Sequence, residues 1–568
     1  MSTKVFDSVI PRIEDWPIFR LSEDRKNFVQ EIDDFTFQRI VSTHTPAEIK
    51  EIIAQTIYNE RLRMKEDPWK VDPPNDAQLW KQISRDLVRK GIDNKDIDSS
   101  KESNEAILKQ IIHRYSTEIV GTFKISTFQF ARRFLTAFFG RLLNAASAKS
   151  FFKLLTGGKL QIADRFKIVG DIDQIHNLIK EGTVVILPTH FSNLDSILVG
   201  FVMDQVLGLP SFSYGAGLNL YNSGAAAYFM NRLGAYRVDR RKKNDIYLET
   251  LKAMSNLSMQ RGTNSLFFPG GTRSRSGTLE SRLKLGLLGT VIEAQRSKAV
   301  KNPNDKIFVV PLVMSYHFVL EAQFLVDSHL KITGKERYFK IGKDEFYSFR
   351  KWLQYIWKFF SEDSEITLSF GKPMDVLGNF VGQNGESIDK FGNKIDISQY
   401  FLTNGEIKQD LQREEEYTRL LSEKIVERFK AENVVLTSHF VAYIAFNLLK
   451  NYDSKLDLFA VLRLLPEDFV FPKASFIGAA TQLQQKLIQA EKDGLLKLSE
   501  QMHLPIDELV QNGIAELGIY HINKPLLFTD DGDIESKNFN LLYFYHNRLD
   551  SYGLHRKVSW NNYPIKMI

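Results

Sequence analysis

A histidine and an aspartate that follow an apolar segment are the residues of this chain best suited to acid–base chemistry. His190 follows segment 183–189, which has the pattern of a buried strand, and Asp195 stands where a helical pattern begins. A carboxylate can hold one imidazole nitrogen, fix its tautomer and stabilise the imidazolium, while the other nitrogen takes a proton from a hydroxyl. The pair predicts a general base, although a strand-end His beside a helix N-cap Asp has the same spacing.

Two basic segments follow later strand-like patterns and could bind an anion. The first, 234–247 (GAYRVDRRKKNDIY), contains Arg240 within a dense basic run. The second is 267–277 (FFPGGTRSRSG), and its candidate binding residues are Gly270, Gly271, Thr272, Arg273, Ser274 and Arg275. Glycines let backbone N–H groups approach a ligand, and guanidinium groups bind phosphate oxygens in pairs. Taken alone, each segment also fits a solvated surface loop.

Several other chemistries are not supported by the sequence. The phosphate-loop spacing GxxxxGK[ST] and the G-x-S-x-G elbow of serine hydrolases are both missing. The chain has no cysteine, which excludes disulfides, thiolate metal sites and a Cys nucleophile. Its 11 histidines show no H-E-x-x-H spacing. We therefore expect neither a metal nor a bound cofactor.

Alternating strand and helix patterns predict the frame that positions these residues. Apolar runs at 184–187, 211–214, 236–238, 265–268, 308–316 and 366–370 are separated by helical stretches at 196–207, 245–260 and 283–296. This alternation predicts an α/β fold, in which helices flank a mostly parallel mixed sheet. Ligands bind beyond the carboxyl ends of such strands, where His190 and both basic segments stand. The Gly- and Asn-rich segment 375–396 predicts tight turns.

Length and pattern divide the 568 residues into three predicted parts. These are a helical N-terminal region (1–155), a catalytic domain (156–400) and a helical C-terminal region (401–568). In the first, apolar residues at helical spacing run through 107–143, with Lys124, Arg132, Arg133 and Arg141 between them. Such an amphipathic stretch suits either docking on a membrane or packing of two helices on the next domain.

Charge and hydropathy limit the classes of partner. The formal net charge of +6 is small for this length, so wholesale nucleic-acid binding is not expected. The first residues lack the apolar segment of a signal peptide, and no stretch reads as a clean membrane span. Contact with a membrane would therefore be peripheral.

Taken in order, four segments resemble the motifs of the glycerolipid acyltransferase superfamily. They are HFSNLD (190–195), GAYRVDRR (234–241), FFPGGTRSRSG (267–277) and VPLVMSY (310–316). The extended second motif, the segment YHFVLEAQFLVDSHLKITGKERY and the helical flanks look most like its glycerol-3-phosphate O-acyltransferase branch. This resemblance implies that branch's fold. It also implies transfer of a fatty acyl group to the sn-1 hydroxyl of glycerol 3-phosphate, giving lysophosphatidate for phospholipid synthesis.

The resemblance also implies co-substrates and residue roles. Acyl-CoA or acyl-carrier protein would be the acyl donor, and the enzyme would lie peripherally on the cytoplasmic side of a membrane. His190, oriented by Asp195, would be the base, and the phosphate would be held by Arg240, Arg273 and Arg275. Gly270 and Gly271 could offer N–H groups to the phosphate or to the oxyanion. Alternative acceptors are lysophosphatidate and other phosphorylated or lysolipid molecules.

Two positions depart from the family pattern. The third motif usually reads P-E-G-T-R-S, but this chain has Gly270 in place of the Glu. The branch commonly has Glu after the tyrosine of the fourth motif, where this chain has His317. Both departures bear on acceptor choice, and they are the best support for a further alternative, a non-catalytic membrane or scaffold protein with the same fold.

Overall fold

A seven-stranded sheet lies at the centre of the computed structural model, with strand order β1-β7-β6-β2-β5-β3-β4. The structure describes residues 4–69, 71–93, 97–147, 162–218, 221, 224–334, 365–453 and 455–567. All neighbouring strands are parallel except the antiparallel pair β6 and β7. The strands are β1 (Phe166–Val169), β2 (Gly182–Pro188), β3 (Ser213–Gly217), β4 (Ala235–Val238), β5 (Ser265–Leu266), β6 (Lys306–Tyr316) and β7 (Ile366–Phe370). This mostly parallel sheet confirms the predicted α/β class.

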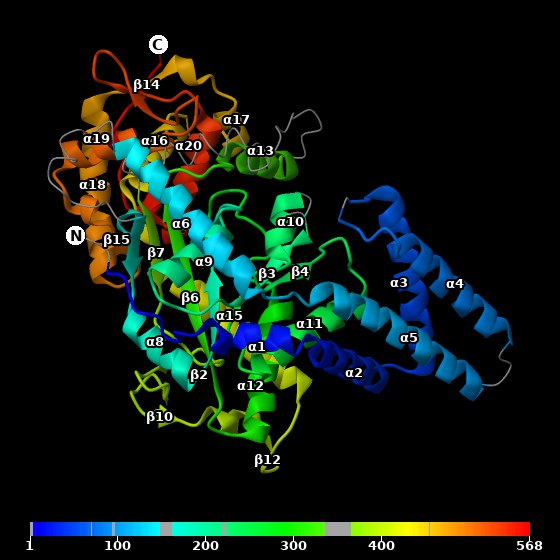
Figure 1. Cartoon of the computed structure of the whole chain (residues 1–568). Helices are drawn as coiled ribbons and strands as arrows, with labels where there is room; N and C mark the ends of the chain where they lie inside the picture. Colours follow the sequence, from blue (N-terminus) through cyan, green and yellow to red (C-terminus); the bar gives the residue numbers. More distant parts are fainter. Residues whose placement is uncertain are drawn as a thin grey trace.

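Helices connect the strands and flank the sheet (Figure 1). They are α8 (Ile172–Glu181), α9 (Asp195–Gln205), α10 (Gly224–Met230), α11 (Asp245–Gln260), α12 (Leu285–Lys301) and α13 (Ala322–Thr333). The predicted turn-rich segment 375–396 forms three two-residue strands, β8 (Phe380–Val381), β9 (Ser387–Ile388) and β10 (Lys394–Ile395). Gly385 and Gly392 adopt positive φ between them, which only glycine does at little cost.

The N-terminal helices begin near the sheet, extend away from one side of it and return to it with the last of the set (Figure 1). They are α1 (Pro17–Glu23), α2 (Arg25–Thr43), α3 (Pro46–Glu66), α4 (Asp76–Asp93), α5 (Ile97–Ile119) and α6 (Ile125–Ser147). A hydrophobic core joins α2, α3 and α5 to α11 and β4. The predicted amphipathic stretch 107–143 is thus two helices: α5 buries its apolar face in this core, whereas α6 leaves Phe130 and Phe134 exposed.

The C-terminal region shares its core with the sheet. One continuous cluster of buried residues runs from β2 and β6 into the last helices. These helices are α15 (Leu411–Ala431), α16 (Thr437–Lys450), α17 (Leu458–Leu462), α18 (Lys473–Lys492), α19 (Ile506–Glu516) and α20 (Phe539–His546). Small sheets accompany them, built on β13 (Val434–Val435) and β14 (Phe469–Phe471). The region is therefore less purely helical than predicted.

The predicted domain limits stay predictions. Residue 155 lies outside the described residues, whereas residue 400 lies in the 3-10 helix Ile397–Phe401, next to the fully buried Phe401.

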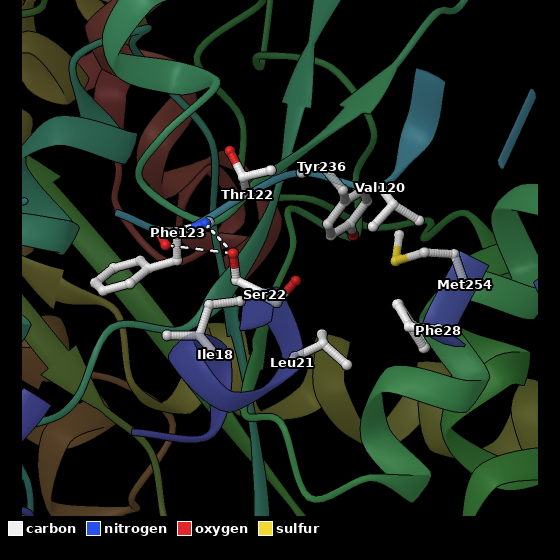
Figure 2. Close-up of a pocket in the computed structure, with 12 residues that line it drawn as sticks. Ile18, Leu21, Ser22, Phe28, Val120, Thr122, Phe123, Tyr236 and Met254 are labelled. Atoms are coloured by element: carbon white, nitrogen blue, oxygen red, sulfur yellow. Dashed lines mark hydrogen bonds between the residues drawn. The ribbon is translucent and has the colours of Figure 1, made fainter. Parts of the chain in front are cut away.

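A small cavity marks the joint between the N-terminal helices and the sheet edge (Figure 2). Ser22 connects α1 to the segment before α6: its hydroxyl donates to Phe123 O at 3.3 Å and accepts from Phe123 N at 2.8 Å. The cavity measures about 20 Å³, room for about one water. Its lining is mostly apolar, as Ile18, Leu21 and Met254 illustrate, so it reads as a packing joint.

Within the described residues, no helix combines the length and the apolar character needed to cross a bilayer.

Candidate active site

The loop between β2 and α9 brings His190 and Asp195 together. The apolar, β-branched residues of β2 form a fully interior strand that ends at Pro188, and His190 follows in the loop. His190 Nδ1 lies 2.9 Å from Asp195 Oδ2. The His190 side chain is 11% exposed and that of Asp195 is fully buried. The predicted pair is therefore a contact between two side chains, just beyond the carboxyl end of β2.

Asp195 is held from both sides. Its Oδ2 also accepts from the backbone N–H groups of Phe191 (2.7 Å) and Ser192 (3.0 Å). Its Oδ1 accepts from the hydroxyl of Tyr316 at 2.6 Å. Asp195 is also the first residue of α9, where the helix dipole favours a negative charge. These donors hold the carboxylate in place, where it can stabilise an imidazolium.

The contacts of His190 determine which nitrogen can act as a base. Because the carboxylate oxygen must accept, Nδ1 carries the proton and Nε2 keeps its lone pair. No residue in the described part of the chain bonds Nε2. The ring stacks on Phe268, with centroids 4.1 Å apart. The imidazole is thus fixed in orientation, with one nitrogen available.

The loop after β5 fastens the backbone of His190. Ser274 N–H donates to His190 O at 2.7 Å, and the His190 N–H donates to Glu280 Oε1 at 2.8 Å. The Ser274 hydroxyl donates to Thr278 O, so this residue supports the loop. Gly271, at φ +75°, closes a turn by donating its N–H to Phe268 O at 3.0 Å.

Arg273 reaches the same loop through a buried carboxylate. Its guanidinium lies 3.1 Å from Glu321 Oε1, and Glu321 is fully buried. Glu321 also accepts from Asn193 N (3.0 Å) and from the Ser192 hydroxyl (2.7 Å). Glu321, which no sequence pattern indicated, therefore holds Arg273 beside the His190 loop.

Arg240 and Arg275 complete a group of three guanidiniums. Both side chains are exposed, as is Thr272, and neither arginine has a carboxylate partner among the described residues. Desolvation by neighbouring atoms lowers the pKa of Arg240, and the positive charges of Arg273 and Arg275 lower it further. Guanidiniums that repel one another form a surface to which an anion would bind favourably. The charges of Arg273 and Arg275 therefore act on Arg240.

Two further cations of the first basic segment, Arg241 and Lys242, are neutralised by carboxylates. Arg241 donates to Asp239 (2.8 Å) and to Asp72 (2.6 Å) and lies over the Trp69 ring. Lys242 is buried and donates to both oxygens of Glu118 of α5 at 2.7 Å. These two cations therefore anchor the segment, whereas the side chain of Arg240 stays exposed.

The C-terminal region contacts the back of the site. Arg548 is buried, donates to Met314 O at 2.7 Å and lies over the Phe191 ring at 4.3 Å. Burial lowers the pKa of Arg548 to about 10. His317, which takes the place of a family Glu, turns away into this region and lies 3.1 Å from both Ser438 Oγ and Glu516 Oε2.

Four residues that contact the site were not among the candidates predicted from the sequence: Tyr316, Glu280, Glu321 and Arg548. Only Tyr316 gave a usable signal, because a buried tyrosine hydroxyl generally requires a partner.

Among the described residues, no three His, Cys, Asp or Glu side chains gather to hold a metal ion.

Comparison with known proteins finds a family whose members resemble this part of the chain. The model of the family described as Acyltransferase matches residues 171–315, which include the His190 loop, both basic segments and most of β6. Residues 171–315 are thus similar to an acyltransferase domain. This confirms the resemblance to the glycerolipid acyltransferases.

Curated relatives of the acyltransferase domain are named glycerol-3-phosphate acyltransferase. The protein from Alteromonas mediterranea is 24% identical over 248 residues, and that from Pseudoalteromonas atlantica is 24% identical over 307 residues. The matches cover 42% and 53% of this chain but only 26% and 32% of those proteins. This chain therefore matches about a quarter to a third of their length.

A solved structure to which this chain is similar is that of a 1-acyl-sn-glycerophosphate acyltransferase from Thermotoga maritima. It is 13% identical, with a TM-score of 0.24, and the match covers 68% of this chain and 98% of the other.

Proposed function

We propose that this chain transfers a fatty acyl group from acyl-CoA or acyl-carrier protein to the sn-1 hydroxyl of glycerol 3-phosphate. The observation that supports this most is that the loop carrying Arg273 and Arg275 contacts the His190 loop, within residues that match an acyltransferase domain. The charges of both arginines also act on Arg240. A base and an anion-binding surface at one sheet edge suit an acceptor that carries both a hydroxyl and a phosphate. The names of the curated relatives point to the same acceptor.

The chemistry needs one base and no covalent intermediate on the protein. His190 Nε2 takes the proton of the acceptor hydroxyl as its oxygen bonds to the thioester carbonyl carbon. Collapse of the tetrahedral intermediate then breaks the C–S bond. The imidazolium returns the proton to the leaving sulfur, which departs as a free thiol. Asp195 stabilises the imidazolium between these steps.

The cations position the acceptor and a backbone group can serve the oxyanion. Arg240, Arg273 and Arg275 would hold the phosphate and so place the hydroxyl near Nε2. Since Gly271 uses its N–H within a turn, the N–H of Gly270 is our candidate for the oxyanion.

An acceptor panel tests this function. The purified chain is incubated with labelled acyl-CoA or acyl-carrier protein and, in turn, with glycerol 3-phosphate, dihydroxyacetone phosphate, lysophosphatidate and another lysophospholipid. We expect labelled lysophosphatidate as the main product. Preference for lysophosphatidate would instead favour the 1-acylglycerol-3-phosphate acyltransferase alternative, and absence of transfer to every acceptor would favour a non-catalytic protein.

We also propose that α6 and α10 dock on a membrane, through an aromatic surface made of Phe130, Phe134, Tyr228 and Phe229. Phe130 stacks on Phe134 and on Phe229, with centroids 6.3 and 6.0 Å apart. Phe130, Phe134 and Tyr228 are 58%, 53% and 50% exposed, which is unusual for rings that touch one another.

Charge favours an anionic lipid surface as the occupant. Lys124 and Arg133 are exposed on the same helical segment, and Arg232 lies over the Tyr228 ring. The cytoplasmic leaflet carries anionic lipids that attract such cations. A peripheral position on that side would bring the site to its lipid product.

Flotation with vesicles tests the docking surface. Replacing Phe130 and Phe134 with Ser should release the chain from vesicles that contain anionic lipid. The control is Phe391→Ser, which removes a 77% exposed ring from the distant β9–β10 turn. Equal flotation of all three proteins would contradict docking through α6.

A further inference from the structure

Glu280 occupies the space in which a side chain at position 270 would begin. A Cβ built on Gly270 would lie 3.0 Å from Glu280 Cγ and 3.4 Å from its Oε1. Gly271 needs its positive φ, but Gly270 is not among the glycines with positive φ. The backbone at 270 would therefore accept a side chain, and Glu280 is what excludes one.

The carboxylate of Glu280 acts on the backbone of the base. Its Oε1 accepts from the His190 N–H at 2.8 Å, while the His190 carbonyl accepts from Ser274 N–H. The peptide groups on both sides of the His190 Cα are thus held by the loop that carries Arg273 and Arg275. Glu280 Oε2 is buried and has no hydrogen-bond partner in the described part of the chain. An unpaired carboxylate oxygen is costly to bury and needs an explanation.

The charges around Glu280 link it to the same site. Burial raises the pKa of Glu280 to about 7. Asp195 raises it further, whereas Arg548 and hydrogen bonds from the backbone N–H groups of His190 and of Glu280 itself lower it. A carboxyl with this pKa can be neutral at physiological pH, and its unpaired oxygen is then cheaper to bury.

We propose that Glu280 is a positioning residue for His190 and supplies, from the far end of the loop, the carboxyl group that the family motif places at position 270. The proposal deepens the proposed function, on which only its catalytic readouts depend. It also gives a reason for Gly270: a Cβ at this position would press on the side chain of Glu280. On this account Gly270 and Glu280 are a linked pair, and the departure from the motif does not indicate an inactive protein.

Single substitutions measure what the contact does. Glu280→Ala should lower kcat by about 10²-fold with a smaller change in KM for the acceptor, because a base misplaced by about 1 Å loses that much. Glu280→Gln keeps an acceptor for the His190 N–H and has the shape of the protonated acid, so it should retain most of kcat. Ser281→Ala, at the exposed neighbouring residue, is the control and should behave as wild type.

Moving the carboxyl group back to position 270 is the sharper test. Gly270→Glu alone should lower the melting temperature and kcat, because its Cβ would press on Glu280 and place two carboxyls together. The double variant Gly270→Glu/Glu280→Ala should recover kcat relative to Glu280→Ala, a coupling that a double-mutant cycle detects. If Glu280→Ala fails to fold, the comparison of Glu280→Gln with the double variant carries the test.

Hydrogen exchange separates this proposal from the proposed function. The amide of His190 should exchange faster in Glu280→Ala than in wild type or Glu280→Gln, whether or not any acceptor is acylated. Unchanged exchange together with wild-type kcat in Glu280→Ala would overturn the proposal. A double variant no better than Glu280→Ala would also overturn it. A wild type without transfer would defeat the proposed function alone.

Discussion

The side of the site that carries His190 is enclosed by hydrogen bonds, whereas the side that carries Arg240 and Arg275 is open. Asp195 accepts four hydrogen bonds: from the imidazole, from two backbone N–H groups and from Tyr316. In contrast, neither of the two exposed arginines has an ion-pair partner among the described residues. Both sides come from loops at the same edge of one sheet, so the difference reflects their tasks.

The difference shows what each task requires. A base must hold one tautomer and one orientation before the substrate arrives, so its partners belong to the protein. A cation that binds a phosphate must keep its donors for the ligand, because a resident carboxylate would compete with it. Arg273 is intermediate, since it shares a loop with Arg275 but forms an ion pair with the buried Glu321. We expect substitutions on the enclosed side to affect kcat and those on the open side to affect KM.

The largest effect should come from the base. His190→Ala should lower kcat by about 10²–10⁴-fold, the usual contribution of general-base catalysis, with little change in the binding of the phosphorylated acceptor. Initial rates at several acceptor concentrations give both quantities. His503→Ala, which removes a half-exposed imidazole of the C-terminal region, is the control. Turnover near that of wild type in His190→Ala would remove this residue from the mechanism.

The next effect tests whether the enclosure of Asp195 matters. Tyr316→Phe removes the donor to Asp195 Oδ1, and a hydrogen bond to a charged group contributes about 1.5–3 kcal/mol. We expect kcat to fall by about 10-fold or more while KM changes less. Tyr236→Phe is a matched control, because the buried hydroxyl of Tyr236 has no partner in the described part of the chain. Equal rates for the two variants would contradict an active role for the Tyr316 contact.

On the open side, Arg240→Ala and Arg275→Ala should act mainly through KM. Each removes charge-assisted hydrogen bonds to the phosphate, so we expect KM for the acceptor to rise about 10-fold with kcat largely retained. Salt should raise the KM of wild type more than that of either variant, because exposed charges are screened. A fall in kcat at unchanged KM would place these arginines on the enclosed side and break the distinction.

The sequence was sufficient for much of the frame and for the central pair. Strand β7 and helix α11 have the predicted limits, because each is a well-bounded run of one periodicity. The contact between His190 and Asp195 followed from a strand end and a helix start. Strand β1 was missed, because it is a short edge strand of four residues, three of them only partly buried. Its pattern is too brief to signal a strand.

The residues that contact the site from distant parts of the chain could not be predicted, because only the tertiary structure brings them next to it. Glu280 contacts the His190 loop from 90 positions downstream and Arg548 contacts β6 from 234 positions downstream. No periodicity encodes such a pairing. The basic segment after β4 shows the same limit: its charges are equal in the sequence, but Arg241 and Lys242 are neutralised by N-terminal carboxylates and Arg240 is not.

The smallest effect on catalysis should come from Arg241, the neighbour of Arg240 in the sequence. Arg241→Ala should leave KM nearly unchanged but destabilise the fold by about 3 kcal/mol, because it leaves the buried Asp239 without its guanidinium and removes one of the two that contact the part-buried Asp72. Thermal unfolding beside initial rates separates the two results. Arg241→Lys should restore little, since an ammonium cannot bridge both carboxylates and also cover the Trp69 ring. A KM increase as large as that of Arg240→Ala, with stability intact, would make Arg241 a ligand of the phosphate.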